Sequence, residues 1–427
     1  MEDVKYTYYC ISNDVSLNYI NNDKIDDIDN KQNIDLLCFY NVLELKKLPD
    51  LSKFINLKCL HFYNNNKITE LPNLSYYNKL IVINCSNNKI TELPDLSHLI
   101  NLEYLYCSNN LLTKLPDLSL CVKLVELRCD NNKLVELNKL NKCVKLEKIH
   151  CDNNNLYKIS SLSNLKYLHT LYCHDNNLTK LPNLYNLISL VFLICSNNKL
   201  TTLPNLSSLI NLKYLICDNN ELIKLPDVSK CFNLTQIDCS NNKLIELTNF
   251  TYLISIFEID YDTNEIIKLL DINLTKFKSL SCSNNKLIQL PDLSKCVNLT
   301  NLICNGNNLT ELPELNIFNK LSFLNCSYNQ LNKLEDLSKL IKLTKLYCHH
   351  NKFNRLCNLP INLKFIDVNH NNFTKLNYSI TQCKKLHYYK KYNKYKKSYK
   401  IHGILNYIIS TYYYKYIIQY YNKIYLF

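Results

Sequence analysis

Apolar and polar positions recur along most of this chain with one fixed period. In residues 80–93, Leu-Ile-Val-Ile-Asn-Cys-Ser-Asn-Asn-Lys-Ile-Thr-Glu-Leu, apolar residues occupy relative positions 1, 4, 6, 11 and 14, and Asn occupies position 9. Positions 4 and 6 alternate as in a short strand that buries one face. A recurring pattern of this kind predicts a stack of small, similar units that share one core.

The clearest column of the pattern consists of cysteines. Neighbouring members are 22 residues apart, except for one step of 43, and an Asn follows each of them three residues later. Free Cys usually behaves as a small buried hydrophobe, and no Cys-x-x-Cys pair occurs, so we predict core residues rather than metal ligands or disulfides. The cysteines are Cys85, Cys107, Cys129, Cys151, Cys173, Cys195, Cys217, Cys239, Cys282, Cys304, Cys326 and Cys348.

The Asn column predicts a ladder of hydrogen bonds where each strand ends. An Asn side chain can bond to main-chain groups in a turn. Stacked in successive units, such side chains would satisfy backbone polar groups that are buried there. We therefore assign a structural ladder to the two columns, represented by Cys85, Cys107, Cys129, Asn88, Asn110 and Asn132.

The whole unit reads Leu-x-x-Leu-x-Cys-x-x-Asn-x-Leu-x-x-Leu-Pro-x-Leu, and this motif resembles the leucine-rich repeat family. It is most similar to the 22-residue repeats of internalins and phosphatase regulators, and its Cys-Ser/Asp-Asn-Asn variant resembles repeat proteins of giant DNA viruses. The resemblance covers residues 34–376, roughly 15 or 16 units. It implies an α/β solenoid: a curved horseshoe with a parallel β-sheet on its concave face and short 3₁₀ or irregular segments on its convex side.

The two ends of the chain differ from the repeats. Residues 1–33 are expected to form an N-terminal cap or a partly disordered head, and residues 377–427 a basic, Tyr-rich segment. The net charge is +13, and residues 384–427 contain ten Lys without Asp or Glu. Apolar residues at helical spacing over 401–427 predict a helix that caps the last unit. The basic run 384–400, with interleaved Tyr, would alternatively suit nucleic acid or an anionic membrane surface.

The sequence shows no sign of export or of membrane insertion. Its start lacks the basic stretch and apolar run of a signal peptide. No uncharged apolar stretch reaches the ~18 residues that a membrane span needs. We therefore expect an intracellular monomer without a cofactor, located in the host cytoplasm if the source is viral.

A partner would contact the residues that lie between the recurring core and turn positions of the repeat pattern, because those residues face outward. On the concave face, five apolar residues of adjacent units are expected to form one exposed patch of the kind that marks a protein contact. We predict a non-enzymatic scaffold that binds a protein partner there. The partner-binding residues are Tyr104, Tyr106, Tyr172, Phe192, Ile194, Tyr214 and Ile216, with the last five forming the patch. Their polar neighbours are Arg128, His150, His169, His174, Asp218, Asp238 and Asp260.

Other functions remain open from the sequence. An enzyme such as an effector-type ubiquitin ligase would need a catalytic domain, and the head 1–33 and the tail 384–427 have only about 33 and about 44 residues. An adaptor that recruits a host ubiquitin ligase is another alternative, although no adaptor box is evident. His349, His350 and His370 are near one another in the pattern and admit a metal site, but exposed polar positions explain them more simply.

Overall fold

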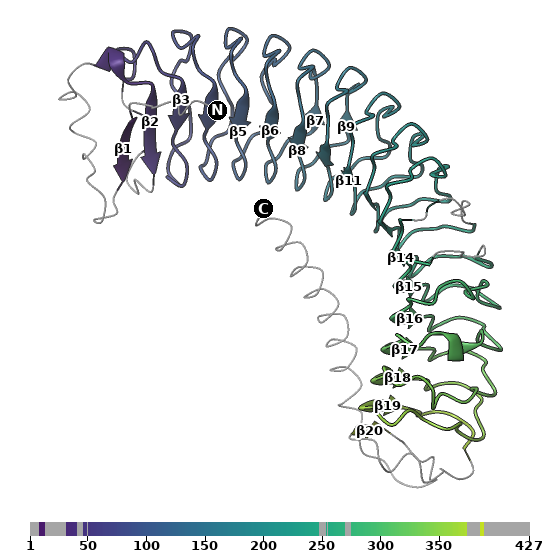
Figure 1. Cartoon of the computed structure of the whole chain (residues 1–427). Coiled ribbons are helices and arrows are strands. Elements are labelled where there is room, and N and C mark those ends of the chain that lie inside the picture. The colour runs from purple at the N-terminus through teal and green to yellow at the C-terminus, as the bar shows by residue number, and fades with distance from the viewer. Residues whose placement is uncertain are drawn as a thin grey trace. The chain divides into compact units, whose positions relative to one another are not determined.

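The chain divides into two compact parts, residues 1–388 and residues 389–427. The first unit in this sense, residues 1–388, is a solenoid of short parallel strands (Figure 1). The structure is a computed structural model. The residues that it describes all belong to the first unit, and they are 8–12, 31–40, 46–48, 50–246, 253, 255–269, 275–373 and 385–387.

One 18-stranded sheet runs through this unit, and its strands pair in parallel with constant register. For example, Leu105 lies beside Leu127, and Leu193 lies beside Leu215. The strands are, in spatial order, β1 (Tyr8–Ser12), β2 (Leu36–Tyr40), β3 (Cys59–His61), β4 (Val82–Asn84), β5 (Tyr104–Tyr106), β6 (Glu126–Arg128), β8 (Lys148–His150), β10 (Thr170–Tyr172), β11 (Phe192–Ile194), β12 (Tyr214–Ile216), β13 (Gln236–Asp238), β14 (Glu258–Asp260), β15 (Ser279–Ser281), β16 (Asn301–Ile303), β17 (Phe323–Asn325), β18 (Lys345–Tyr347), β19 (Phe365–Asp367) and β20 (Lys385–His387). A second, two-stranded sheet joins β7 (Glu136–Leu137) to β9 (Lys158–Ile159).

Each unit buries the same set of apolar positions. In the unit of β5, Leu102, Leu105, Cys107 and Leu112 have no exposed surface. The equivalent residues of all units join into one continuous core. One unit alone could not enclose this apolar edge, so the units are stable only as a stack. The parallel-strand solenoid predicted from the repeat pattern is confirmed.

The connections between strands are turns and short extended segments. In a typical unit, the Leu99 amide donates to the Leu96 carbonyl at 2.9 Å, and the Leu102 amide donates to the Leu99 carbonyl at 3.0 Å. The Asp95 carboxylate accepts from the Ser97 amide at 2.9 Å, which holds the start of this turn. Within the described ranges, helical structure is limited to two short 3₁₀ turns, η2 (Lys31–Asn33) and η3 (Leu315–Ile317). Short 3₁₀ or irregular connections were predicted, and they are confirmed.

A residue in the left-handed backbone region precedes the ladder Asn in nearly every unit. The φ angle is +57° at Asn87, +55° at Asn109 and +53° at Asn131. Asn tolerates this region better than most residues do. Gly306 fills the position in one unit with φ +67°, and a Cβ atom there would collide with the Asn284 side chain. The backbone role of the first Asn in the Asn-Asn pair was not among the predictions from the sequence.

The sheet reaches beyond the limits expected for the repeats. Strand β1 pairs with β2, and β20 pairs with β19, so parallel pairing extends outside residues 34–376. The division into 1–33, 34–376 and 377–427 stays a prediction, as does the placement of the sheet on a concave face. The capping helix expected over 401–427 lies outside the described residues.

Candidate functional site

The cysteine column lies inside the core. Cys85, Cys107 and Cys129 have no exposed surface, and the Cys107 thiol donates to the Arg128 carbonyl oxygen at 3.3 Å. Burial raises the pKa of Cys85 to about 12 and keeps the pKa of Cys107 and of Cys129 well above the ordinary value. Because the thiolate is the reactive form of Cys, this column is poorly suited to nucleophilic or redox chemistry.

We expect most thiols of the native protein to be inert. Seventeen of the described cysteines are buried, and the chain has 21 in all. At pH 8, no more than four thiols should therefore react promptly with an aromatic disulfide reagent, while all 21 should react after denaturation. Absorbance of the released thiolate measures both numbers. Prompt reaction of most thiols in the folded protein would contradict the buried column.

The Asn column connects each unit to the one before it. Asn110 donates through Nδ2 to the carbonyl oxygens of Cys85 and Cys107, at 2.9 and 3.1 Å. Its Oδ1 accepts from the Ile90 amide at 3.0 Å. One side chain thus satisfies donors and acceptors of two units in a buried place. The same column contains Asn88 and Asn132, each bonded to carbonyls of its own and the preceding unit.

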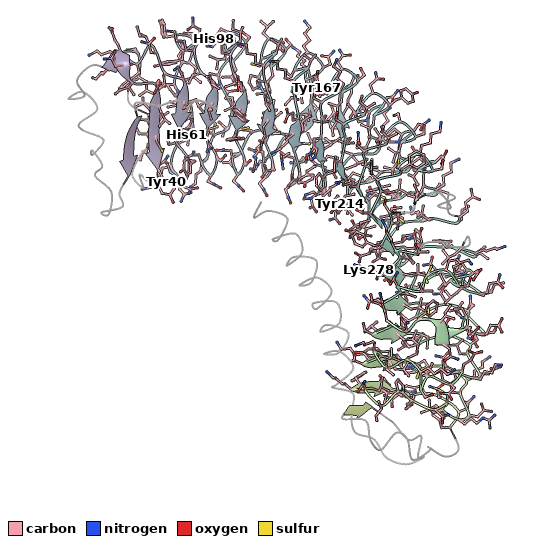
Figure 2. The ribbon with its side chains drawn as sticks, in the orientation of Figure 1. Tyr40, His61, His98, Tyr167, Tyr214 and Lys278 are labelled. Atoms are coloured by element: carbon pink, nitrogen blue, oxygen red, sulfur yellow. The ribbon has the colours of Figure 1, made fainter. Side chains whose placement is uncertain are left out.

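The sheet face is the surface formed by strand side chains that point away from the core. In a three-residue strand such as β5, the first and third residues point outward and the middle one is buried. His61 and Tyr214 project from this side, whereas His98 and Tyr167 lie on the opposite side of the solenoid (Figure 2). The face carries the residues that were predicted to bind a partner.

Four rings form a row on the sheet face, from β8 to β12. His150 meets Tyr172 edge to face, with 4.8 Å between ring centroids, and Tyr172 meets Phe192 edge to face at 6.5 Å. Phe192 stacks on Tyr214 at 4.9 Å with only 4° between the ring planes. Register places these two side by side, and strands about 4.8 Å apart hold their rings at stacking distance. We call His150, Tyr172, Phe192 and Tyr214 the aromatic row.

The exposed patch expected from the sequence is smaller in the structure. Tyr172, Ile194 and Ile216 are each only 6% exposed, so the prediction that they are exposed is wrong. They occupy the third strand position, where register places a residue of each adjacent strand beside them. Phe192 and Tyr214, at the first strand position, are partly exposed. The apolar surface open to a partner in this region is therefore formed by these two rings.

Tyr104 and Tyr106 lie on the sheet face but outside the aromatic row. Their ring centroids are 6.1 Å apart, and the Arg128 guanidinium lies 5.5 Å from the Tyr106 ring centroid. Arg128 also forms an ion pair with Glu126 at 2.5 Å. Burial raises the pKa of Tyr106 to about 12. Strand β6 thus separates the two tyrosines from the aromatic row with a pair of opposite charges.

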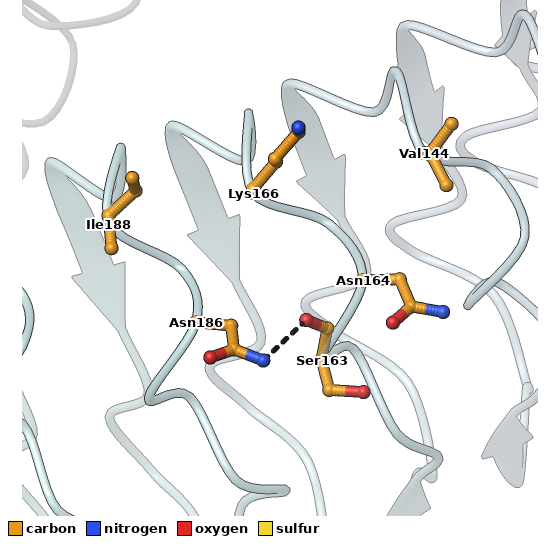
Figure 3. A pocket seen from close by; sticks show the side chains of 6 residues that line it. All are labelled: Val144, Ser163, Asn164, Lys166, Asn186 and Ile188. Atoms are coloured by element: carbon orange, nitrogen blue, oxygen red, sulfur yellow. Dashed lines mark hydrogen bonds between the residues drawn. The ribbon is translucent and has the colours of Figure 1, made fainter.

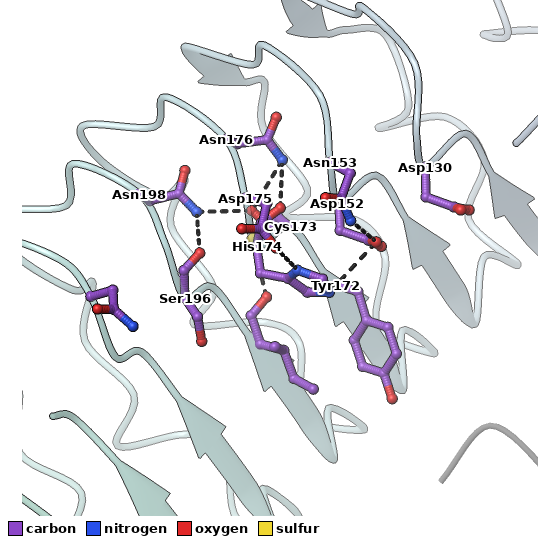
Figure 4. Close-up of polar contacts among 12 residues, drawn as sticks. Asp130, Asp152, Asn153, Tyr172, Cys173, His174, Asp175, Asn176, Ser196 and Asn198 are labelled. Atoms are coloured by element: carbon purple, nitrogen blue, oxygen red, sulfur yellow. Dashed lines mark hydrogen bonds and ion pairs between the residues drawn. The ribbon is translucent and has the colours of Figure 1, made fainter. Parts of the chain in front are cut away.

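Beside the aromatic row, His174 joins carboxylates of neighbouring units (Figure 4). Its Nδ1 lies 2.7 Å from Asp175 Oδ2, and its Nε2 lies 3.5 Å from Asp152 Oδ2. Burial alone would lower the pKa of His174, but the carboxylates of Asp175, Asp152 and Asp218 outweigh it and the pKa is raised. By contrast, burial lowers the pKa of His150 to about 4, and that of His169 falls for the same reason. Of the three, only His174 has a raised pKa.

Carboxylates gather on the next strands, from β12 to β14. Parallel register places Asp238 beside Ile216 and Asp260 beside Asp238. Burial, followed by the negative charge of Asp218, raises the pKa of Asp238 to about 7. Burial also raises the pKa of Asp218, Asp262 and Glu258. We call the group the acidic strip, and its members are Asp218, Asp238, Glu258, Asp260 and Asp262.

The three histidines near the C-terminal end of the solenoid stack instead of converging. The ring centroids of His350 and His370 are 4.0 Å apart with 29° between the ring planes, and Tyr328 stacks on His350 at 4.1 Å. His349 Nδ1 lies 2.8 Å from His350 Nδ1. In the described part of the chain, no group of three or more His, Cys, Asp or Glu is arranged to hold a metal ion.

A shallow depression lies away from the sheet face (Figure 3). Its lining includes Val144, Lys166 and Ile188, with Asn186 donating to the Ser163 carbonyl oxygen at 3.1 Å. That bond links adjacent units, so these polar groups help to hold neighbouring repeats together.

Of the basic run 384–400, only the backbone of residues 385–387 is described. No described helix has the length and apolar character needed to cross a membrane.

Comparison with known proteins identifies similar repeats. A family model described as "Leucine Rich repeats (2 copies)" matches residues 78–120. No curated protein sequence matches the chain. A leucine-rich repeat protein from Leptospira interrogans is 26% identical, with a TM-score of 0.70, over 83% of this chain and 96% of that one. YopM from Yersinia pestis, a leucine-rich effector protein, is 30% identical, with a TM-score of 0.58, over 73% of this chain and 89% of that one. The functional domain of InlJ from Listeria monocytogenes, which includes a cysteine ladder, is 29% identical, with a TM-score of 0.57, over 73% and 71% of the two chains.

Proposed function

This chain belongs to the leucine-rich repeat proteins, and we propose that it is a scaffold without catalytic activity that binds a protein partner through its sheet face. The fold supports protein interaction in general, because a stack of units presents one long continuous surface. The proposal places the contact between β8 and β14, where the aromatic row and the acidic strip adjoin.

The aromatic row is the observation that carries this proposal. Phe192 and Tyr214 form a stacked pair of partly exposed rings on a rigid sheet. Aromatic side chains held in this way contribute strongly to protein interfaces, because they bury a large area at a small loss of side-chain entropy. Tyr172 is buried and meets Phe192 edge to face at 6.5 Å, which supports the pair from one side. A partner that covers the two rings would therefore gain contact area without first ordering the surface.

The proposal of a scaffold without catalysis is supported by the chemistry of the buried thiols. The described column cysteines lie in the core, on the side of the sheet opposite to the aromatic row, with raised pKa values. Such groups cannot reach a substrate bound on the sheet face. His150 and His169, which do reach that face, have lowered pKa values because they are buried. The arrangement favours binding over proton transfer or nucleophilic attack.

The experiment compares the wild-type protein with variants of the aromatic row. Proximity labelling in the natural cell, followed by quantitative mass spectrometry, measures which proteins each of them captures. Phe192→Ala together with Tyr214→Ala should reduce the specifically captured proteins at least tenfold, because both exposed rings are lost. Phe323→Ala is the matched control, since Phe323 is also a partly exposed aromatic residue at the first position of a strand. It should leave capture unchanged. Equal capture by the double variant and the wild type, with both folded by circular dichroism, would refute binding at the aromatic row.

A further inference from the structure

The acidic strip differs from the other charged parts of the sheet face. On β6, Glu126 already lies between two cations, with Arg128 at 2.5 Å and Lys148 at 3.6 Å. In the acidic strip, no ion pair joins Asp218, Asp238 or Asp262 to another residue that the structure describes. When ionised, Asp218, Asp238 and Asp262 therefore carry negative charge that no described ion pair compensates.

Hydrogen bonds hold these carboxylates in place without neutralising them. Asp238 Oδ1 accepts from the backbone amide and the hydroxyl of Ser240, at 3.0 and 2.8 Å. Asp262 Oδ1 accepts from the Ser281 hydroxyl at 2.7 Å. All these donors are neutral groups. The raised pKa values in the strip have the same origin, since the charged forms are partly buried without a cation beside them.

The described lysines near these strands form no ion pair with Asp218, Asp238 or Asp262, and Lys243, which follows β13, pairs with Glu221 at 2.9 Å. Lys213 and Lys278 precede the first residues of β12 and β15, whereas Asp218 and Asp262 follow the last residues of β12 and β14. The outward positions of β12, β13 and β14 contain no Lys, Arg or His. His174, which influences Asp218, is already engaged by Asp175 and Asp152. Among the described residues, none therefore supplies Asp218, Asp238 or Asp262 with a cation that is not already engaged by other carboxylates.

We propose that the acidic strip and the adjoining aromatic row together bind an extended, lysine- or arginine-bearing peptide segment of the partner protein. This inference rests on the proposed scaffold function and specifies the partner's chemistry. The aliphatic stem of a Lys or Arg side chain would lie along Tyr214, and its charged head would reach Asp218 and Asp238. A single metal ion fits less well, because no three carboxylates of the strip are arranged around one point.

Charge complementarity also predicts how such a segment would be selected. A cationic peptide is attracted to carboxylates that lack a described cationic neighbour, and it is repelled by the ten Lys of residues 384–427. Two or more cationic residues spaced along an extended segment could meet carboxylates on successive strands, which lie about 4.8 Å apart. An acidic or neutral segment would leave the partly buried carboxylates without compensation, which discriminates against it.

The test measures binding of a fluorescent decapeptide of alternating lysine and serine to the full chain by anisotropy at pH 7.5. The strip variant combines Asp218→Asn, Asp238→Asn and Asp262→Asn, which keeps each Oδ1 acceptor. It should raise Kd at least tenfold, and the single Asp238→Asn variant should raise it about threefold. A peptide of alternating glutamate and serine should not bind.

The control variant combines Asp95→Asn, Asp227→Asn and Asp292→Asn. These three carboxylates accept from the backbone amide of a nearby Ser in exposed turns, and the change in net charge is the same as in the strip variant. The control should change Kd less than twofold. An equal loss in both variants would show that binding follows net charge alone and would overturn the proposal, as would unchanged binding by the folded strip variant.

Capture from cells separates this inference from the proposed function. If the strip variant captures the same proteins as the wild type while the Phe192→Ala and Tyr214→Ala double variant loses them, the scaffold stands and the cationic segment is refuted. If the double variant retains capture while the lysine peptide still requires the strip, binding by the strip stands and the aromatic contact is refuted. Loss in both variants, with the control unchanged, supports the two proposals together.

Discussion

Replacement of Asn198 by Ala should lower the free energy of unfolding by about 3–5 kcal/mol, because several buried polar groups lose their partners at once. Nδ2 of Asn198 donates to the carbonyl oxygens of Cys173, Cys195 and Ser196, at 2.9, 3.2 and 3.0 Å. Its Oδ1 accepts from the Leu178 amide at 2.9 Å. Urea denaturation followed by circular dichroism measures the loss.

Lys199→Ala provides the matched control for this experiment. Lys199 is the next residue, it is exposed, and its backbone amide, which donates to the Leu178 carbonyl at 2.9 Å, is retained by Ala. We expect a change within about 0.5 kcal/mol, as for most surface substitutions. Because long repeat arrays can unfold in segments, hydrogen exchange should also show faster exchange of the Leu178 amide in Asn198→Ala. A loss below about 1 kcal/mol would mean that water replaces the ladder bonds.

Replacement of Asp238 by Asn should stabilise the protein at alkaline pH and have little effect near pH 4. The folded state raises the pKa of Asp238 from 3.8 to about 7, so it binds the proton more tightly than the unfolded chain does. Ionisation in the folded state therefore costs stability, and this cost grows as the pH rises from about 4 to about 7. Asn keeps the Oδ1 acceptor for Ser240 and cannot ionise.

The expected gain at pH 8 is about 1–2 kcal/mol. The full shift would correspond to about 4 kcal/mol at ~1.4 kcal/mol per pKa unit, and partial access to solvent and coupling to Asp218 reduce it. Asp227→Asn is the control, because Asp227 has the same Asp-x-Ser turn but is exposed, and a backbone hydrogen bond from Ser229 lowers its pKa. It should slightly destabilise the protein at pH 8. Urea denaturation at several pH values tests both variants, and a pH-independent gain for Asp238→Asn would contradict the assignment.

The period of the sequence was sufficient to predict the solenoid, because each position of the unit meets the same surroundings in every turn. Leu105 and Cys107 are buried for the same reason as Leu127 and Cys129, so one unit explains the others. The left-handed residue at Asn87 or Asn109 could have been recognised too. An Asn-Asn pair directly after a strand is a turn signal, and only the second Asn was given a role.

The candidate site could be predicted only in part, since exposure on a sheet depends on neighbouring strands. Tyr172 and Phe192 both point outward, yet the first is buried and the second is partly exposed. Exposure of an outward side chain depends on the size of its neighbours on the adjacent strands. The alternation of apolar and polar residues within one strand carries no information about those neighbours. The acidic residues Asp218, Asp238 and Asp260 were recognised as neighbours of the patch. Only the register of β12, β13 and β14 shows that Asp238 lies directly beside Asp260 and Ile216.

The ladder bonds of the solenoid have short reach, and this shapes how the gene can change. The side chain of Asn198 bonds within its own unit and to the unit before it, and that of Asn220 repeats the same bonds one unit later. Recombination between the gene's own repeats can therefore add or remove a whole unit while every remaining ladder bond is re-formed. Loss or gain of a single residue within the strand would instead displace the Asn from its turn. The ladder bonds therefore constrain the internal order of a unit more than they constrain the number of units.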